Sequence, residues 1–220
     1  MKLPTEPYLA QVQRWPQAGR HILAQFDTDS VVVYQAYRPS IGHYAVQHQT
    51  FGGEFSFTRM SWIKTNFLWM MYRSGWGTKP GQEVTLAIRI QRSGFDHLLH
   101  AAVHSSFVAD VYPDQAAWTD AVAHSSVRLQ WDPDHDPSGA KVERRAIQLG
   151  LRDEALIQYA QSWLIEIEDI SDFVAEQRRY AQTRTTYAQL RTPREEIYPV
   201  DDVYSARQLG VSGGDAAQAT

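Results

Sequence analysis

The chain has 220 residues, no cysteine and a formal charge of −4 at pH 7, and 43% of its residues are hydrophobic. This composition is typical of a globular protein and excludes a disulfide framework and a thiolate zinc site. The net negative charge argues against a protein that coats nucleic acid, although it allows a local basic cleft. The N-terminus does not resemble a signal peptide and no apolar run is long enough to cross a bilayer, so we predict a cytoplasmic protein without a membrane segment.

Apolar patterns along the chain predict strands and helices in an irregular order. Strands are expected at 21–26, 31–34, 55–58, 84–90, 127–131, 143–149 and 163–167. Helices are expected at 8–18, 39–47, 61–72, 95–103, 113–122, 153–161 and 170–180. The sequence contains no βαβ rhythm, glycine-rich phosphate motif or internal repeat. The prediction is therefore an α+β fold, with a mixed or mostly antiparallel sheet as its core and helices around it.

The C-terminal part of the chain differs in composition from the rest. Residues 1–183 are predicted to form a single domain, and beyond Thr183 the chain turns polar. Residues 184–220 are therefore expected to be a polar tail that is partly flexible, with a frayed end around Ser212–Asp215. The sequence predicts neither the oligomeric state nor whether this tail docks on the domain.

An acidic loop follows the predicted strand at 127–131. Asp132, Asp134 and Asp136 alternate there, and Glu143 follows Asp132 by eleven residues, which partly matches the ligand spacing of a calcium loop. Pro137 takes the place of the sharp-turn glycine, so a polar surface loop with side-chain-to-backbone bonds is favoured over a metal site. A metal-dependent hydrolase built on these aspartates and a histidine remains a minor alternative.

The segment 55–77 interleaves cationic and aromatic side chains. Its cations are Arg59, Lys64 and Arg73, and its rings include Trp62, Trp69, Tyr72 and Trp76. Rings can stack on bases while cations meet phosphates, so this composition suits a nucleotide or a single strand of nucleic acid. An amphipathic helix that buries its aromatic side is the alternative. Arg59 and Lys64, close to the start of the predicted helix, are the best binding candidates because a helix N-terminus already favours anions.

Glu143 begins the predicted strand at 143–149. It shares a face with Ile147 and Leu149, where a carboxylate needs a partner or a function. An ion pair with Arg145 or another arginine at the sheet rim is the structural alternative.

Three stretches of the sequence resemble one known family. They are VVVYQAYRPSIGHYAV (31–46), FGGEFSFTRMSWIKTNFLWMMYRSGWGTK (51–79) and RLQWDPDHDPSGAKVERRAIQLGLR (128–152). They are similar to the bacterial and eukaryotic family called domain of unknown function 4291, over about residues 20–180. The resemblance implies a compact intracellular protein and brings no activity with it.

A second resemblance is to the ADP-ribosyltransferase fold, which cleaves NAD at its glycosidic bond in a cleft between two sheets. Members of that fold tend to show three separated sequence signals: a strand ending in Tyr-His or Arg, a Ser-x-Ser/Thr segment before a helix, and a Glu on a later strand. The corresponding segments here are the strand ending at Val33-Tyr34-Gln35, the segment Ser56-Phe57-Thr58, and Glu143. The resemblance implies that Glu143 steadies the oxocarbenium-like sugar. It gives catalytic roles to Glu143, Tyr34 and Ser56, and NAD contacts to Gln35, Arg38, Thr58, Arg59, Lys64 and Tyr72.

Two functional hypotheses follow. The first is an enzyme that cleaves NAD and transfers ADP-ribose to an acceptor, with nucleic acid as one possible acceptor. The second is a non-catalytic module that binds a nucleotide or nucleic acid through segment 55–77. The first requires Glu143 and Tyr34 to face one cleft together with Arg59 or Lys64, whereas the second does not need Glu143.

Overall fold

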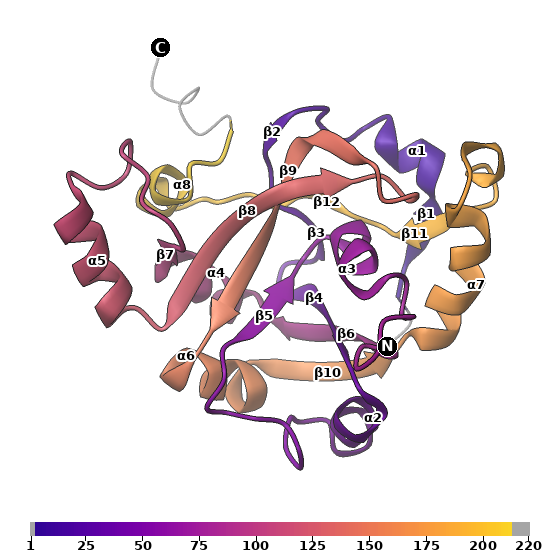
Figure 1. The fold of residues 1–220 in the computed structure, drawn as a ribbon, viewed down its shortest axis with the longest axis horizontal. Coiled ribbons are helices and arrows are strands. Elements are labelled where there is room, and N and C mark those ends of the chain that lie inside the picture. Colours follow the sequence, from indigo (N-terminus) through magenta and orange to yellow (C-terminus); the bar gives the residue numbers. More distant parts are fainter. Residues whose placement is uncertain (1–2, 213–220) are drawn as a thin grey trace.

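The computed structural model, which describes residues 3–212, has the predicted α+β fold, with helices around a curved sheet (Figure 1). The strands are β1 (Thr5–Pro7), β2 (Gly19–Arg20), β3 (Leu23–Phe26), β4 (Ser30–Tyr37), β5 (Ser61–Lys64), β6 (Val84–Gln91), β7 (Ala102–His104), β8 (Val127–His135), β9 (Lys141–Leu151), β10 (Leu164–Asp169), β11 (Arg191–Pro193) and β12 (Glu196–Ile197). The α-helices are α1 (Tyr8–Val12), α2 (Pro39–His48), α3 (Phe67–Ser74), α4 (Arg92–His100), α5 (Gln115–His124), α6 (Asp153–Ile157), α7 (Ser171–Ala181) and α8 (Val203–Leu209). A π-helix, η1 (Gln158–Ser162), and a 3₁₀ turn, η2 (Arg184–Thr186), complete the described part.

The main sheet is mixed and mostly antiparallel, as expected. Its strand order is β10-β6-β4-β5-β9-β8-β7, and only the β7–β8 and β2–β9 pairs described are parallel. The longest ladders join β4 to β6 and β8 to β9. No helix in residues 3–212 has the length and apolar character needed to cross a membrane.

The sheet separates two hydrophobic clusters. Successive residues of β4 point to opposite faces, so Val31 and Val33 join one cluster while Val32 and Tyr34 join the other. The first cluster takes in Phe95 of α4. The second packs against α3 and α7. Because β4 is buried on both faces, its β-branched run reads as an unbroken apolar segment in the sequence.

Several predicted elements differ from the structure around residues 51–74. Residues 55–58, predicted as a strand, lie in a loop, where Phe55 packs against Phe51 with ring centroids 4.6 Å apart. The helix predicted at 61–72 is two elements, β5 and α3. Asn66 separates them because its side chain accepts a hydrogen bond from the Trp69 amide at 2.7 Å and so caps α3.

The predicted boundaries of two further elements, the acidic loop and the helix at 95–103, differ from the structure. The acidic loop was expected to begin at Asp132, but β8 continues as far as His135. The helix predicted at 95–103 ends at His100, and residues 102–104 form β7 beside β8.

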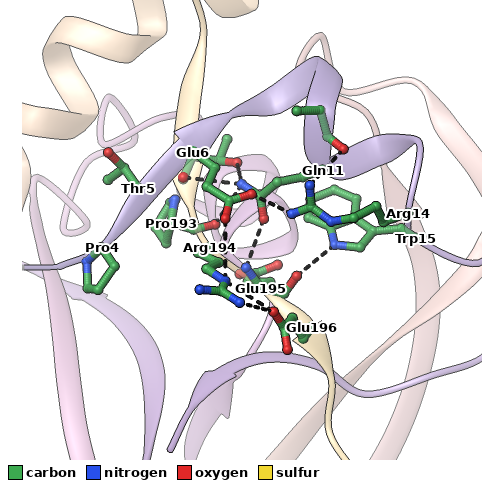
Figure 2. Close-up of polar contacts among 12 residues, drawn as sticks. Pro4, Thr5, Glu6, Gln11, Arg14, Trp15, Pro193, Arg194, Glu195 and Glu196 are labelled. Carbon is green, nitrogen blue, oxygen red and sulfur yellow. Dashed lines mark hydrogen bonds and ion pairs between the residues drawn. The ribbon is translucent and has the colours of Figure 1, made fainter.

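The segment after Thr183, predicted as a tail, is built into the domain as far as it is described. Strand β11 pairs with β1, and Leu190, Tyr198 and Leu209 are at most 2% exposed. Figure 2 shows the contact with α1: the Gln11 amide donates to Pro193 O at 3.0 Å, and Gln11 Oε1 accepts from the Glu195 amide at 2.8 Å. Trp15 Nε1 donates to Glu195 O at 2.9 Å. The predicted frayed end lies outside the described residues, except for Ser212.

Glu195 also connects this segment to α3. Its Oε1 accepts a 2.6 Å hydrogen bond from the Phe67 amide, at the first turn of the helix. Burial raises the pKa of this carboxyl well above its usual value, and the Phe67 amide opposes that rise. The C-terminal segment therefore helps to hold the start of α3, the helix that forms one wall of the pocket described next.

Candidate ligand-binding site

A pocket of about 540 Å³ opens where β4 and β5 separate. The two strands share a single register pair, Tyr34 with Lys64. Beyond that pair, the side chain of Gln35 spans the gap, donating to Ser61 Oγ at 2.8 Å and to Trp62 O at 3.2 Å. Gln35 is itself fixed by Tyr159, whose hydroxyl donates to Gln35 Oε1 at 2.7 Å. The floor of the pocket is thus a rigid polar junction between strands.

Two helices and two loops close the sides of the pocket. Arg38 and Ile41 come from the start of α2, and Met70 and Arg73 come from α3. The loop between α2 and β5 supplies Glu54, Phe55, Ser56, Arg59 and Met60, and the loop between α3 and β6 supplies Gly81 and Gln82. The lining therefore joins parts of the chain that are separated by up to several dozen residues in sequence.

Three cations in this pocket lack a carboxylate partner. Among the described residues, the side chains of Arg59 and Arg73 form no ion pair or hydrogen bond, and Lys64 Nζ has only Trp62 O, at 3.5 Å. A fourth cation, Arg38, is paired with Glu54 at 2.6 Å, and Glu54 also accepts from Ser40 Oγ at 2.7 Å. Glu54 is the single carboxylate among the lining residues described. The pocket is therefore electropositive, which suits an anionic ligand.

Lys64 is the most unusual of these cations because its side chain lies inside the protein. The residue is 6% exposed, between β4 and β9 in the sheet and next to the start of α3. Burial, with a smaller contribution from the Arg73 charge, lowers the pKa of Lys64 to about 8, and Asp132 opposes the shift. A buried amine without a counter-ion is costly, and an anion entering the pocket would relieve that cost.

The structure brings together five of the residues predicted to act on NAD. Gln35, Arg38, Ser56, Arg59 and Lys64 all line the pocket. Thr58 does not line it and lies on the adjoining loop, with its hydroxyl 3.1 Å from Ser56 Oγ. Tyr72 is on the side of α3 that faces a different, 270 Å³ pocket, and its ring stacks on His135 at 3.5 Å between centroids.

The structure does not bring Tyr34 and Glu143 to this pocket. Tyr34 is completely buried in the second cluster against Phe67, and burial raises its pKa well above the usual value. Glu143 is exposed near the start of β9, five residues before Gln148, the strand neighbour of Lys64. At about 3.3 Å per residue, that separation is roughly 17 Å along the strand. The geometry that the NAD-cleavage hypothesis required of these two residues is therefore not present.

The carboxylates of the acidic segment 132–136 have partners within the protein. Asp132 accepts from Gln130 and Gln148, Asp134 pairs with Arg144, and Asp136 accepts from the backbone of Ser138 and Ala140. No group of three or more histidine and carboxylate side chains that could hold a metal occurs among residues 3–212. The side-chain-to-backbone bonds of Asp136 match the favoured prediction of a polar turn.

A family model described as domain of unknown function, DUF4291, matches residues 21–198. The chain belongs to the DUF4291 family. The match covers β3 through β12 and so includes every residue that lines the cationic pocket. No curated protein matches the chain.

Sequence reasoning missed several lining residues of the DUF4291 pocket. Arg73 was noted among the cations of segment 55–77 but received no role, and its i, i+3 spacing from Met70 on α3 is the signal that places both on one wall. Glu54 and Gln82 gave no signal, because both lie in loops, outside the periodic patterns of helices and strands.

Proposed function

We propose that this DUF4291 protein binds a phosphate-bearing, nucleotide-type small molecule in the pocket between β4 and β5. The observation that carries the proposal is that three cations without counter-ions, Arg59, Lys64 and Arg73, line one pocket. Arginine side chains match phosphate oxygens in a two-pronged geometry, and a buried lysine adds a point charge. The proposal is for a cytoplasmic protein, in keeping with its lack of cysteine.

The shape of the pocket favours a small molecule over a nucleic-acid strand. Its volume lies within the usual range of about 300–1,000 Å³ for small-molecule sites. The half-buried rings of Tyr37 and Trp62 line it and offer flat surfaces for a base. In contrast, Phe67 and Trp69 of segment 55–77 are at most 5% exposed, so this segment does not present a continuous aromatic groove.

The proposal predicts a loss of nucleotide affinity when the free arginines are removed. Calorimetric titration with ADP and NAD is expected to show binding to the wild-type protein, weakening as salt concentration rises. Arg59→Ala and Arg73→Ala should each weaken binding about tenfold or more, because a hydrogen bond to a charged group contributes about 1.5–3 kcal/mol.

Arg179→Ala is the matched control, since Arg179 is an exposed arginine of α7 outside the pocket lining. It should bind like the wild type. Absence of binding at millimolar concentrations of both ligands would contradict the proposal.

NAD cleavage with ADP-ribosyl transfer is the second candidate, and nucleic acid is the first acceptor to test. It is favoured by the convergence on one pocket of four residues predicted to contact NAD, Gln35, Arg38, Arg59 and Lys64, and of Ser56, predicted to be catalytic. The carboxylate that lines this pocket is Glu54, so Glu54 would take the role of stabilising an oxocarbenium-like sugar.

Nicotinamide release should therefore be lost in Glu54→Gln and retained in Glu143→Ala. Release that depends on Glu143 would refute this assignment, and absence of release in the wild type would leave binding as the function.

A further inference from the structure

A row of polar side chains crosses the sheet next to the cationic pocket. Lys64 of β5 is directly opposite Gln148 of β9, and Gln148 is directly opposite Gln130 of β8. Directly opposite residues of an antiparallel pair point to the same face, so these three side chains share one side of the sheet. Asp132, two residues after Gln130, is on that face as well. Figure 1 shows β5, β9 and β8 side by side.

The row is accessible from outside. Gln130, Asp132 and Gln148 are all partly exposed, while the alternate residues Leu129, Ile147 and Leu149 are buried in the first cluster. The row therefore lies on the face of β8 and β9 opposite the first cluster. It begins at Lys64, the innermost cation of the pocket, and at a strand spacing of about 4.8 Å it extends about 10 Å from Lys64 to Gln130.

The hydrogen bonds within the row leave several oxygen atoms free to accept further hydrogen bonds. Gln130 Nε2 donates to Asp132 Oδ1 at 2.8 Å, and Gln148 Nε2 donates to Asp132 Oδ2 at 2.6 Å. Both amide NH₂ groups are thus directed at the carboxylate. Among residues 3–212, nothing donates to Oε1 of either glutamine. A carboxylate can accept about four hydrogen bonds, so Asp132 also keeps free acceptor positions.

A flat surface adjoins the row on the same face. Trp62 is opposite Gly150, two residue pairs from Lys64 and Gln148 and so on the same face. The indole lies against this glycine so closely that an added Cβ would be 3.0 Å from its ring atoms. The absence of a side chain at Gly150 therefore allows Trp62 to lie over the sheet, where a base can stack on it.

We propose that Gln130, Asp132 and Gln148 form a subsite that recognises an amino group on the base of the bound nucleotide. This inference rests on the proposed function: the phosphates contact Arg59, Lys64 and Arg73, and the base lies toward β9 and β8. An exocyclic amine donates to the free oxygens of the row. A carbonyl oxygen at the same position would face acceptors and lose its hydrogen bonds to water without replacement. The ligand class is therefore a nucleotide with an amino-bearing base such as adenine.

The test compares ADP with inosine diphosphate, which carries a carbonyl oxygen in place of the adenine amine. In calorimetric titrations the wild-type protein should bind ADP about tenfold or more tightly than inosine diphosphate, because a hydrogen bond to a charged acceptor such as Asp132 contributes about 1.5–3 kcal/mol. Asp132→Asn should reduce this ratio toward one, because an asparagine amide can donate to the carbonyl. Gln148→Met, which leaves Asp132 in place, should also reduce it.

Asp110→Asn, a change at an exposed loop residue, is the matched control and should keep the wild-type ratio. Equal affinities for the two nucleotides, or a ratio that survives both Asp132→Asn and Gln148→Met, would overturn the subsite and leave the phosphate site standing. Failure of both nucleotides to bind the wild type would overturn the proposed function and the subsite together.

Discussion

Replacing Lys64 with methionine is expected to stabilise the protein at pH 7 and, at the same time, to weaken nucleotide binding. The Lys64 ammonium group is buried without a carboxylate partner, and its pKa is lowered from the usual 10.5 to about 8. A shift of this size corresponds to a cost of about 3 kcal/mol for keeping the amine charged in the native state. Methionine has a similar length and no charge, so Lys64→Met should remove most of that cost.

The pH dependence of this effect separates it from a simple improvement in packing. Below about pH 8 the amine is protonated in both the native and the unfolded state, so the full cost is present. Between about pH 8 and 10.5 the native state loses the proton while the unfolded state keeps it, and the wild-type protein becomes more stable as pH rises. The stability difference between Lys64→Met and the wild type should therefore shrink over this range.

Urea unfolding at pH 7 and pH 10 measures the stabilisation by Lys64→Met and its decrease with rising pH. Calorimetry with ADP measures the loss of binding. Lys141→Met is the matched control, since Lys141 is an exposed lysine of β9 outside the pocket lining. It should change the free energy of unfolding by no more than about 0.5 kcal/mol. A Lys64→Met protein that is destabilised, or that binds ADP like the wild type, would show that Lys64 has a structural role.

Lys64 illustrates why part of the pocket lining was predictable from the sequence. Cations among aromatic residues are rarely needed for packing, so the sequence alone singled out Arg59 and Lys64 as binding candidates.

The prediction for Glu143 failed for a different reason. It was expected to share a buried face with Ile147 and Leu149, but β9 is 11 residues long and its pairing with β8 shifts register between Arg145 and Lys141, so Glu143 is exposed while Ile147 is buried.

The fold was predictable where periodicity is local. The strands at 31–34 and 84–90 were found because β-branched or alternating residues show a period of two. β5 was missed because only Thr65 and Asn66 separate it from α3, so the two read as one apolar run. Residues 184–220 were predicted to be a tail because their apolar residues Leu190, Tyr198 and Leu209 are isolated in a polar sequence. Their partners come from distant parts of the chain, which no local pattern shows.

The second large effect is expected at the buried ion pair between β8 and β9. Arg144 Nη2 is 2.6 Å from Asp134 Oδ2, and the two side chains are 6% and 1% exposed. Arg144 Nη1 also donates to Pro16 O at 2.6 Å, and the guanidinium lies over the Trp15 ring at 5.3 Å. The pair therefore connects the β8–β9 hairpin to the segment that follows α1.

Arg144→Met should lower the free energy of unfolding by about 3–5 kcal/mol at pH 7, because it leaves the Asp134 carboxylate buried without its counter-ion. Burial already raises the pKa of Asp134, and Arg144 opposes that rise. Without Arg144 the pKa should rise further, so native Asp134 holds a proton that the unfolded state has released. Stability of the variant then falls as pH increases above the unfolded pKa of about 3.9, and the deficit should be smaller at pH 5 than at pH 7.

Urea unfolding of Arg144→Met, Asp134→Leu and the double variant tests this account. The double variant, which leaves no buried charge, should recover a large part of the stability lost in Arg144→Met, since apolar replacements of a buried pair are often neutral. Arg145→Met is the matched control, because Arg145 is the exposed neighbour on the other face of β9. If the double variant is as unstable as the sum of the single changes, the loss comes from the Pro16 and Trp15 contacts of Arg144 and not from the unpaired carboxylate.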